Sequence, residues 1–205
     1  MTEPTFSIVV ATSGRPTLNR TLSSIAPQLE PGDEIIVVCD DTGDAGDTPR
    51  NDAMPRARGS HLAFMDDDDV YARDALEKMR RFAREHPGRI GLFKMRHVVG
   101  TTHWVENQPV LRYGNISTQI IVVPNVPGKL GHWHELPRPG GGNYAGDYIF
   151  VKETAELQGD PVFVDEVIVY VRPPKTALGR LWVPARYRVR LRTRLRELLE
   201  RLARK

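Results

Sequence analysis

The first third of the chain alternates short apolar runs with helical patterns, and this alternation constrains the possible fold more than any other feature. Continuous apolar runs are typical of strands that are covered on both faces in a parallel sheet. They occupy residues 6–11, 34–39 and 61–65, with one helix starting near Pro16 and another helical segment around residues 51–57. This order and spacing predict a doubly wound α/β sheet with right-handed crossovers.

The remainder of the chain is less regular but still reads as one domain. A chain of 205 residues with 40% apolar composition can fill one core, and it is too short for two large domains. We expect an amphipathic helix over residues 71–85, strands over 89–99 and 115–123, a long loop over 124–143, a helix over 144–157, one or two strands over 162–171, and an Arg-rich helical stretch over 178–205. The loop is too long for a simple connection, so we interpret it as a lid or acceptor loop.

Charge is distributed unevenly along the chain. Residues 172–205 carry twelve Lys and Arg against two Asp and Glu, a balance of +10, whereas the rest of the chain has a balance of −7. An acidic body with a basic tail predicts that any attraction to phosphate or anionic lipid comes from the tail.

The compartment is expected to be the cytoplasm, with the membrane surface as a further possibility. Cys39 is the single cysteine, so an internal disulfide is excluded, and its apolar surroundings predict a reduced, buried thiol. The sequence has no apolar stretch long enough to cross a bilayer, and it lacks the pattern of a signal peptide at its start.

Acidic residues follow two of the predicted strands directly. Asp40 and Asp41 follow the second strand, and the run 66–69, four consecutive aspartates, follows the third. In sheets of this kind, ligands bind where the carboxyl ends of the strands meet the loops. Carboxylates without His or Cys suit a hard divalent ion such as Mg²⁺ or Mn²⁺, whose open positions diphosphate oxygens can fill. Such an ion neutralises charge that develops on a departing phosphate.

A simpler interpretation is that Asp68 and Asp69 cap the following helix, where carboxylates satisfy free N–H groups. Two acids are enough for that purpose. Four adjacent like charges repel one another, so a bound cation explains the whole run better.

Several motifs together carry a family resemblance. Arg50-Asn51, then Ala57-Arg58-Gly59, then Phe64-Met65 and the four aspartates closely resemble the inverting A-type (GT-A fold) glycosyltransferases, with their Asp-x-Asp-Asp motif. Ser7-Ile8-Val9-Val10 with Arg15-Pro16, and Val37-Val38 with Asp40-Asp41, resemble the first two nucleotide-contacting loops of that family. The resemblance covers residues 5 to about 86 well and the rest weakly.

The resemblance implies a fold, a domain plan and a reaction. The fold would be a GT-A-like, mostly parallel mixed sheet over residues 1–175, with a nucleotide-sugar half at 5–99, an acceptor half at 100–175, and a basic amphipathic helix at 176–205. The protein would move a sugar from a nucleotide-diphosphate donor, with UDP-sugars favoured, to an acceptor hydroxyl with inversion. Mn²⁺ or Mg²⁺ would assist.

Site residues follow from the same resemblance. Thr12, Arg15, Asp40 and Arg50 would contact the nucleotide sugar together with Asp66 and Asp68; Asp68 and Asp69 would hold the metal, and Asp67 would be dispensable. Without the resemblance, Asp40 and Asp41 are ordinary turn residues in a Gly-rich loop. Arg15 is equally consistent with a plain surface charge.

The general base is expected in the second half. Relatives place an acid-Asp-aromatic sequence at the start of a helix, and Ala145-Gly146-Asp147-Tyr148 matches it except that Gly146 replaces the acid. We predict that Asp147 removes the proton of the acceptor hydroxyl; the alternative is a carboxylate that only stabilises the helix.

The long loop and the last strand raise further candidates. His132, Trp133 and His134 form a possible acceptor or lid group that grips a sugar or ligates the metal, although such residues often only pack a loop. Relatives carry a late His near the last strand, but this chain has Arg172 in the comparable region, where it could instead meet the diphosphate.

The tail at 176–205 and the overall function each leave alternatives open. The tail suits packing on the body or in a homodimer, a membrane surface, or nucleic acid, in that order. A nucleotidyl- or phosphotransferase would use the same aspartates, but the chain lacks the Gly-rich, Lys-containing phosphate loop. A non-catalytic module that kept the fold is the third hypothesis.

Overall fold

The computed structural model describes residues 3–97, 102–103, 110–134 and 145–173. Eight strands form one mixed sheet in the order β2-β1-β3-β7-β5-β8-β4, with β6 paired to β5. The strands are β1 (Phe6–Thr12), β2 (Glu34–Cys39), β3 (His61–Asp66), β4 (Val70–Tyr71), β5 (Gly91–His97), β6 (Thr102–His103), β7 (Ile121–Pro124) and β8 (Val162–Val171). Five of them, β1, β2, β3, β5 and β8, run in the same direction, and β4, β6 and β7 run the opposite way.

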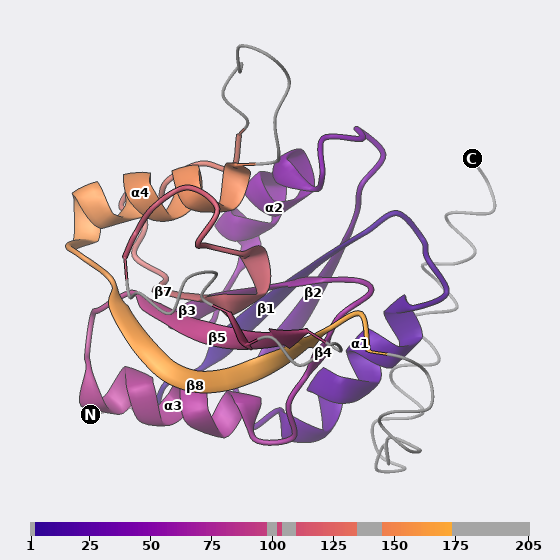
Figure 1. Ribbon diagram of the computed structural model, residues 1–205, viewed down its shortest axis with the longest axis horizontal. Coiled ribbons are helices and arrows are strands. Elements are labelled where there is room, and N and C mark those ends of the chain that lie inside the picture. The colour runs from indigo at the N-terminus through magenta and orange to yellow at the C-terminus, as the bar shows by residue number, and fades with distance from the viewer. Residues whose placement is uncertain (1–2, 98–101, 104–109, 135–144, 174–205) are drawn as a thin grey trace.

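Helices cover both faces of this sheet. α2 (Asp47–Ala53) and α4 (Gly146–Gln158) lie on one face, and α1 (Leu18–Ile25) and α3 (Ala75–Glu85) lie on the other (Figure 1). The α/β sheet predicted from the apolar runs, and the mixed, mostly parallel sheet that the resemblance implies, are therefore confirmed. Within the described ranges, no helix combines the length and the apolar composition that crossing a membrane requires.

The register of the central strands brings the predicted loops to one edge. Thr12 lies opposite Cys39 on β2, and Ala11 lies opposite Asp66 on β3. The loops that follow these three parallel strands consequently start side by side. All seven residues of β1 are buried, which explains its largely apolar sequence.

Gly59 shows why a glycine stands just before β3. A Cβ atom added there would lie 2.5 Å from the backbone nitrogen of Ser7, so only glycine allows this approach. The Gly59 N–H donates to Ser7 Oγ at 2.8 Å, and Ser7 Oγ donates to Glu34 Oε1 at 2.8 Å. The glycine of the Ala-x-Gly motif thus fixes the start of β3 against β1, on the side of β1 opposite to β2.

Several details that the sequence predicts are wrong. Val70 and Tyr71 form β4, which pairs with β8, so α3 starts at Ala75 rather than at residue 71. The helix-cap interpretation of Asp68 and Asp69 is wrong as well, because this short strand separates them from the helix. The predicted strand at 115–123 is shortened to β7 and is preceded by a 3₁₀ helix (Thr118–Ile120). Cys39 is half-buried rather than buried.

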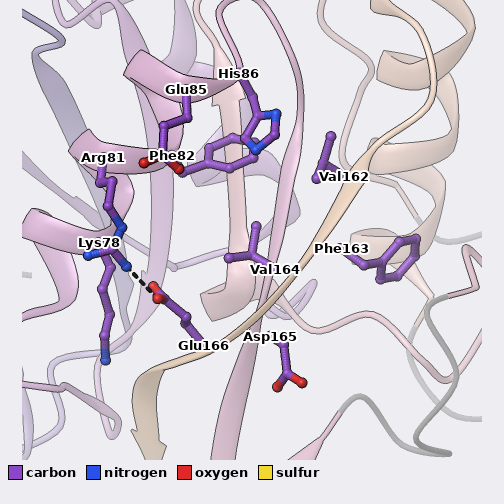
Figure 2. Close-up of a pocket in the computed structure, with 10 residues that line it drawn as sticks. All are labelled: Lys78, Arg81, Phe82, Glu85, His86, Val162, Phe163, Val164, Asp165 and Glu166. Atoms are coloured by element: carbon purple, nitrogen blue, oxygen red, sulfur yellow. Dashed lines mark hydrogen bonds and ion pairs between the residues drawn. The ribbon is translucent and has the colours of Figure 1, made fainter.

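A groove runs between α3 and the first half of β8 (Figure 2). Lys78 and Phe82 line one side, Val164 and Glu166 line the other, and Arg81 forms an ion pair with Glu166. The aspartate run contacts the opposite end of β8, which has ten residues and therefore spans roughly 30 Å. This groove is consequently separate from the candidate site. The predicted basic helix at 176–205 lies outside the described residues. Its predicted role in binding partners therefore stays a prediction.

Candidate active site

The four aspartates differ sharply in their exposure. The side chains of Asp66 and Asp68 are 33% and 13% exposed, whereas Asp67 and Asp69 are buried. The run therefore presents two carboxylates to the edge of the sheet and turns two toward the protein.

Asp67 links the aspartate run to the loop after β1. Its Oδ2 accepts a hydrogen bond from Thr12 Oγ1 at 2.6 Å, and its Oδ1 forms an ion pair with Arg15 Nε at 2.7 Å. Thr12 Oγ1 also accepts from the Gly14 N–H at 2.9 Å. These contacts indicate a structural role for Asp67, and the expectation that it is dispensable stays a prediction.

Asp69 holds the end of β8. Its Oδ1 accepts the Arg172 N–H at 2.8 Å, and its Oδ2 accepts from Gln119 Nε2. Burial raises the pKa of the Asp69 carboxyl to about 7, and the negative charges of Asp66 and Asp68 act in the same direction. Both oxygens of Asp69 are thus engaged with the protein, and its predicted role as a metal ligand stays a prediction.

Asp68 is shared by two arginines. Its Oδ2 accepts from Arg15 Nη1 at 2.8 Å and from Arg172 Nε at 3.0 Å. Arg20 of α1 donates to the Asp68 carbonyl at 3.2 Å and also to the Pro173 carbonyl. No local sequence pattern predicts the Arg20 contact, because it joins positions that are far apart along the chain.

Asp66 is paired with the buried Arg50. Arg50 Nη2 donates to Asp66 Oδ1 at 2.6 Å, and its Nη1 donates to the Ala45 carbonyl at 2.8 Å. The guanidinium also lies over the Trp133 ring, 4.8 Å from the ring centroid. Arg50 therefore joins the exposed end of β3 to the segment that follows β7. It is placed to orient Asp66, while its predicted direct contact with the nucleotide sugar stays a prediction.

Trp133 belongs to the core rather than to an open acceptor surface. Its ring is buried and stacks on Phe150 of α4, with centroids 4.5 Å apart, and it meets Phe64 of β3 edge-on. Asn51 fixes its backbone, since Asn51 Nδ2 donates to the Trp133 carbonyl and the Trp133 N–H donates to Asn51 Oδ1. The expectation that Trp133 stacks on a sugar is contradicted by this packing. The Arg50-Asn51 pair acts as a support for the loop.

The neighbouring histidines contact α4. His134 Nε2 lies 2.9 Å from Glu153 Oε1, and the His132 N–H donates to Glu153 Oε2 at 2.8 Å. Both contacts hold the loop against the helix. Their acceptor role stays a prediction, and the predicted loop continues into residues 135–144, which lie outside the described ranges.

Asp147 stands at the start of α4, in its first turn and buried. Burial raises the pKa of its carboxyl to about 7; the charges of Asp66 and Asp47 also raise it, whereas the Tyr148 N–H and Arg50 lower it. Asp147 is therefore close enough to the Asp66–Arg50 pair for their charges to act on it. A carboxyl with a pKa near neutrality can gain and lose a proton at physiological pH.

Asp40 caps a turn in the loop after β2. Its Oδ1 accepts from Thr42 Oγ1 and from the Gly43 N–H, both at 3.1 Å. These are the local bonds expected of a turn aspartate, and its predicted contact with a nucleoside is untested.

Among the residues that the structure describes, no group of three His, Cys, Asp or Glu side chains is arranged to hold a metal ion. Two carboxylates, those of Asp66 and Asp68, nevertheless lie at the surface of the site. Carboxylate oxygens suit Mg²⁺ or Mn²⁺, and a site with few protein ligands leaves positions for a donor's phosphate oxygens. The chemistry of these two partly exposed carboxylates therefore fits such an ion.

Comparisons with known proteins agree with this fold. Residues 47–134, less than half of the chain, match the family model of Glycosyl transferase family 2. None of the curated proteins is a detectable sequence match. The matched segment starts at α2 and includes Arg50, the aspartate run and Trp133.

Solved structures show the same architecture over most of the chain. Staphylococcus aureus TarS 1–349 is 20% identical with a TM-score of 0.62, over 82% of this chain and 60% of that one. The same protein in complex with UDP-GlcNAc gives 18% identity and 0.61, over 87% and 62%. The mannosyltransferase PcManGT from Pyrobaculum calidifontis, in complex with GDP-Man and Mn²⁺, gives 16% and 0.59, over 86% and 59%.

The chain thus spans about three fifths of these proteins' lengths. At this level of identity the likeness shows the fold, which is GT-A-like.

Proposed function

We propose that this protein is a glycosyltransferase that moves a sugar from a nucleotide-diphosphate donor to an acceptor hydroxyl with inversion, with Asp147 as the general base. One observation carries the proposal. Asp147 is buried in the first turn of α4, burial raises the pKa of its carboxyl to about 7, and the charge of the partly exposed Asp66 adds to this effect. A perturbed acid beside a second carboxylate is typical of catalytic sites.

The donor class is supported by the structural neighbours. TarS has been solved with UDP-GlcNAc and with UDP, and PcManGT with GDP-Man and Mn²⁺. Asp66 and Asp68 occupy the exposed edge after β3, where the loops after β1 and β2 also begin. We favour a UDP-sugar as the donor of this protein.

A divalent cation fits the exposed carboxylates. Asp68 would hold Mn²⁺ or Mg²⁺ together with Asp66. Asp69 would stabilise this part of the site through its hydrogen bonds to Arg172 and Gln119. When bound, the ion would neutralise charge that develops on the departing diphosphate.

Asp147 performs the proton transfer in this scheme. It takes the proton of the acceptor hydroxyl as that oxygen bonds to the anomeric carbon. The bond between the anomeric carbon and the diphosphate oxygen breaks on the opposite face, so that the configuration inverts. The electron pair leaves with the nucleoside diphosphate.

The test compares the wild type with Asp147→Asn and with the exposed Asp52→Asn as a control. Donor binding is measured by thermal shift with Mn²⁺ and a panel of UDP-, GDP-, dTDP- and CDP-sugars, and turnover is measured as release of nucleoside diphosphate. We expect Asp147→Asn to bind the donor like the wild type but to lose turnover by about 10²- to 10⁴-fold, because general-base catalysis typically contributes that much. Asp52→Asn should keep both properties.

Three results would contradict the proposal. If no nucleotide sugar stabilises the wild type, the donor site is wrong. Unchanged turnover in Asp147→Asn would remove Asp147 as the base. Release of pyrophosphate instead of nucleoside diphosphate would assign the site to nucleotidyl transfer.

A further inference from the structure

Two carboxylates of the candidate donor site, those of Asp66 and Asp68, are each paired with arginine side chains. Both carboxylates are only partly exposed, and a diphosphate brought beside them still meets like charge. Positive groups in direct contact with the diphosphate would offset this repulsion, in addition to any ion. Two exposed arginines, Arg15 and Arg172, lie at this point, and both contact Asp68 Oδ2.

The two arginines are held in different ways. Arg15 bridges two carboxylates, since its Nε contacts the buried Asp67 at 2.7 Å and its Nη1 contacts Asp68 at 2.8 Å. Arg172 contacts Asp68 through Nε alone, and its side chain is 75% exposed. Within the described part of the chain, the two Nη groups of Arg172 have no hydrogen-bond partner. Arg172 is thus the guanidinium that can turn to a new anion without breaking a buried ion pair.

The backbone of Arg172 is fixed although its side chain is exposed. Its φ of 43° lies in the left-handed region, which is unfavourable for residues other than glycine. The turn is held because the Arg172 N–H donates to Asp69 Oδ1 at 2.8 Å and because Arg20 donates to both the Pro173 and the Asp68 carbonyls. This strained turn places the root of the side chain directly beside Asp68.

We propose that Arg172 binds the diphosphate of the donor, and that Asp68 holds its guanidinium in place while no donor is present. The inference rests on the proposed glycosyltransferase function and adds a specific residue to it. Planar guanidinium groups suit phosphate oxygens, because they donate two parallel N–H bonds. Arg172 would therefore distinguish nucleoside diphosphates from monophosphates.

Glycine at position 172 makes a sharp test. Arg172→Gly adopts a positive φ without strain and keeps the N–H that Asp69 accepts, so it removes only the side chain. Arg172→Lys keeps the charge but loses the fork of donors, and the exposed Arg73→Ala removes a positive charge elsewhere. Calorimetry would measure the Kd of UDP, UMP, GDP and GMP for each variant.

We expect the wild type to bind one nucleoside diphosphate more tightly than its monophosphate. Arg172→Gly should weaken the diphosphate by about tenfold, the loss typical of a hydrogen bond to a charged group, and leave the monophosphate within about twofold. Arg172→Lys should fall between the two, and Arg73→Ala should match the wild type.

Two results would overturn this inference alone. They are an unchanged diphosphate affinity in Arg172→Gly, or an equal loss for diphosphate and monophosphate, which would show that Arg172 merely supports the site. If the wild type binds none of the four nucleotides, the proposed function fails and the inference fails with it.

Discussion

Replacing Asp147 by Asn should stabilise the protein, and the gain should grow as the pH rises. Burial raises the pKa of the Asp147 carboxyl from 3.8 to about 7 in the folded protein. Because the folded pKa is raised, folding favours the neutral carboxyl. The contribution of the neutral Asp147 carboxyl to the free energy of unfolding is fully present below pH 3.8, and it is lost as the pH rises through about 7. Asn is neutral at every pH and keeps an oxygen that can accept the Tyr148 N–H, which now donates to Asp147 Oδ1 at 2.7 Å.

The magnitude follows from the pKa difference. A pKa difference of roughly 3 units between the folded and unfolded states corresponds to about 4 kcal/mol of unfolding free energy, at about 1.4 kcal/mol per unit. This full amount applies when the carboxyl is ionised in both states. Between pH 5 and pH 8, part of this penalty is already present at the lower pH. The difference in stability between Asp147→Asn and the wild type should therefore increase by roughly 2–3 kcal/mol over that range.

Urea unfolding followed by tryptophan fluorescence at several pH values would measure this difference. Subtraction of the two curves removes the other titrations, above all those of Asp69, with a pKa of about 7, and His61, with a pKa lowered by burial to about 4. The exposed Asp52→Asn serves as the control and should follow the wild-type curve at every pH. A difference between Asp147→Asn and the wild type that stays flat from pH 5 to pH 8 would refute the reasoning.

Two other substitutions test the framework around the site, both measured by urea unfolding. Gly59→Ala should lower the free energy of unfolding by more than about 2 kcal/mol, because its Cβ would lie 2.5 Å from a backbone nitrogen. Its control, Gly88→Ala, meets no atom within 4 Å but has a φ of 73°, and it should cost only about 1 kcal/mol. Equal costs for the two variants would contradict the packing argument. Asp67→Ala should cost about 2–3 kcal/mol, since it leaves the Thr12 hydroxyl and Arg15 without their buried partner. The exposed Asp160→Ala is its control, and a neutral Asp67→Ala would return Asp67 to the dispensable role.

Local patterns predicted the central sheet well because the strands there are apolar on both faces. Residues 6–11, 34–39 and 61–65 needed no partner to be recognised, and their ends predicted the edge where the loops meet. β4 was missed because Val70 and Tyr71 become a strand only by pairing with Val169 and Tyr170, about a hundred residues later. Non-local pairing of this kind leaves no trace in a short window of sequence.

Trp133 shows the same limit for side chains. An aromatic residue in a segment rich in Gly, Pro and His resembles an exposed binding group. Its burial depends on Phe64 of β3, Phe150 of α4 and Arg50 of α2, and the fold brings these three elements together. The Arg50-Asn51 motif could be recognised from the sequence, but its function as a support for the Trp133 segment could not.

The four adjacent aspartates call for a different electrostatic explanation from the one that their sequence suggested. Considered alone, their mutual repulsion favours a bound cation, but the arginines of the protein itself offset most of it. Arg50 pairs with Asp66, Arg15 pairs with Asp67, and Arg15 and Arg172 share Asp68. A pKa of about 7 leaves Asp69 partly protonated near neutral pH. The case for a metal therefore does not depend on the number of charges in the run. It depends on Asp66 and Asp68, because they are the two carboxylates of the run that the fold leaves partly exposed, whereas Asp67 and Asp69 are buried.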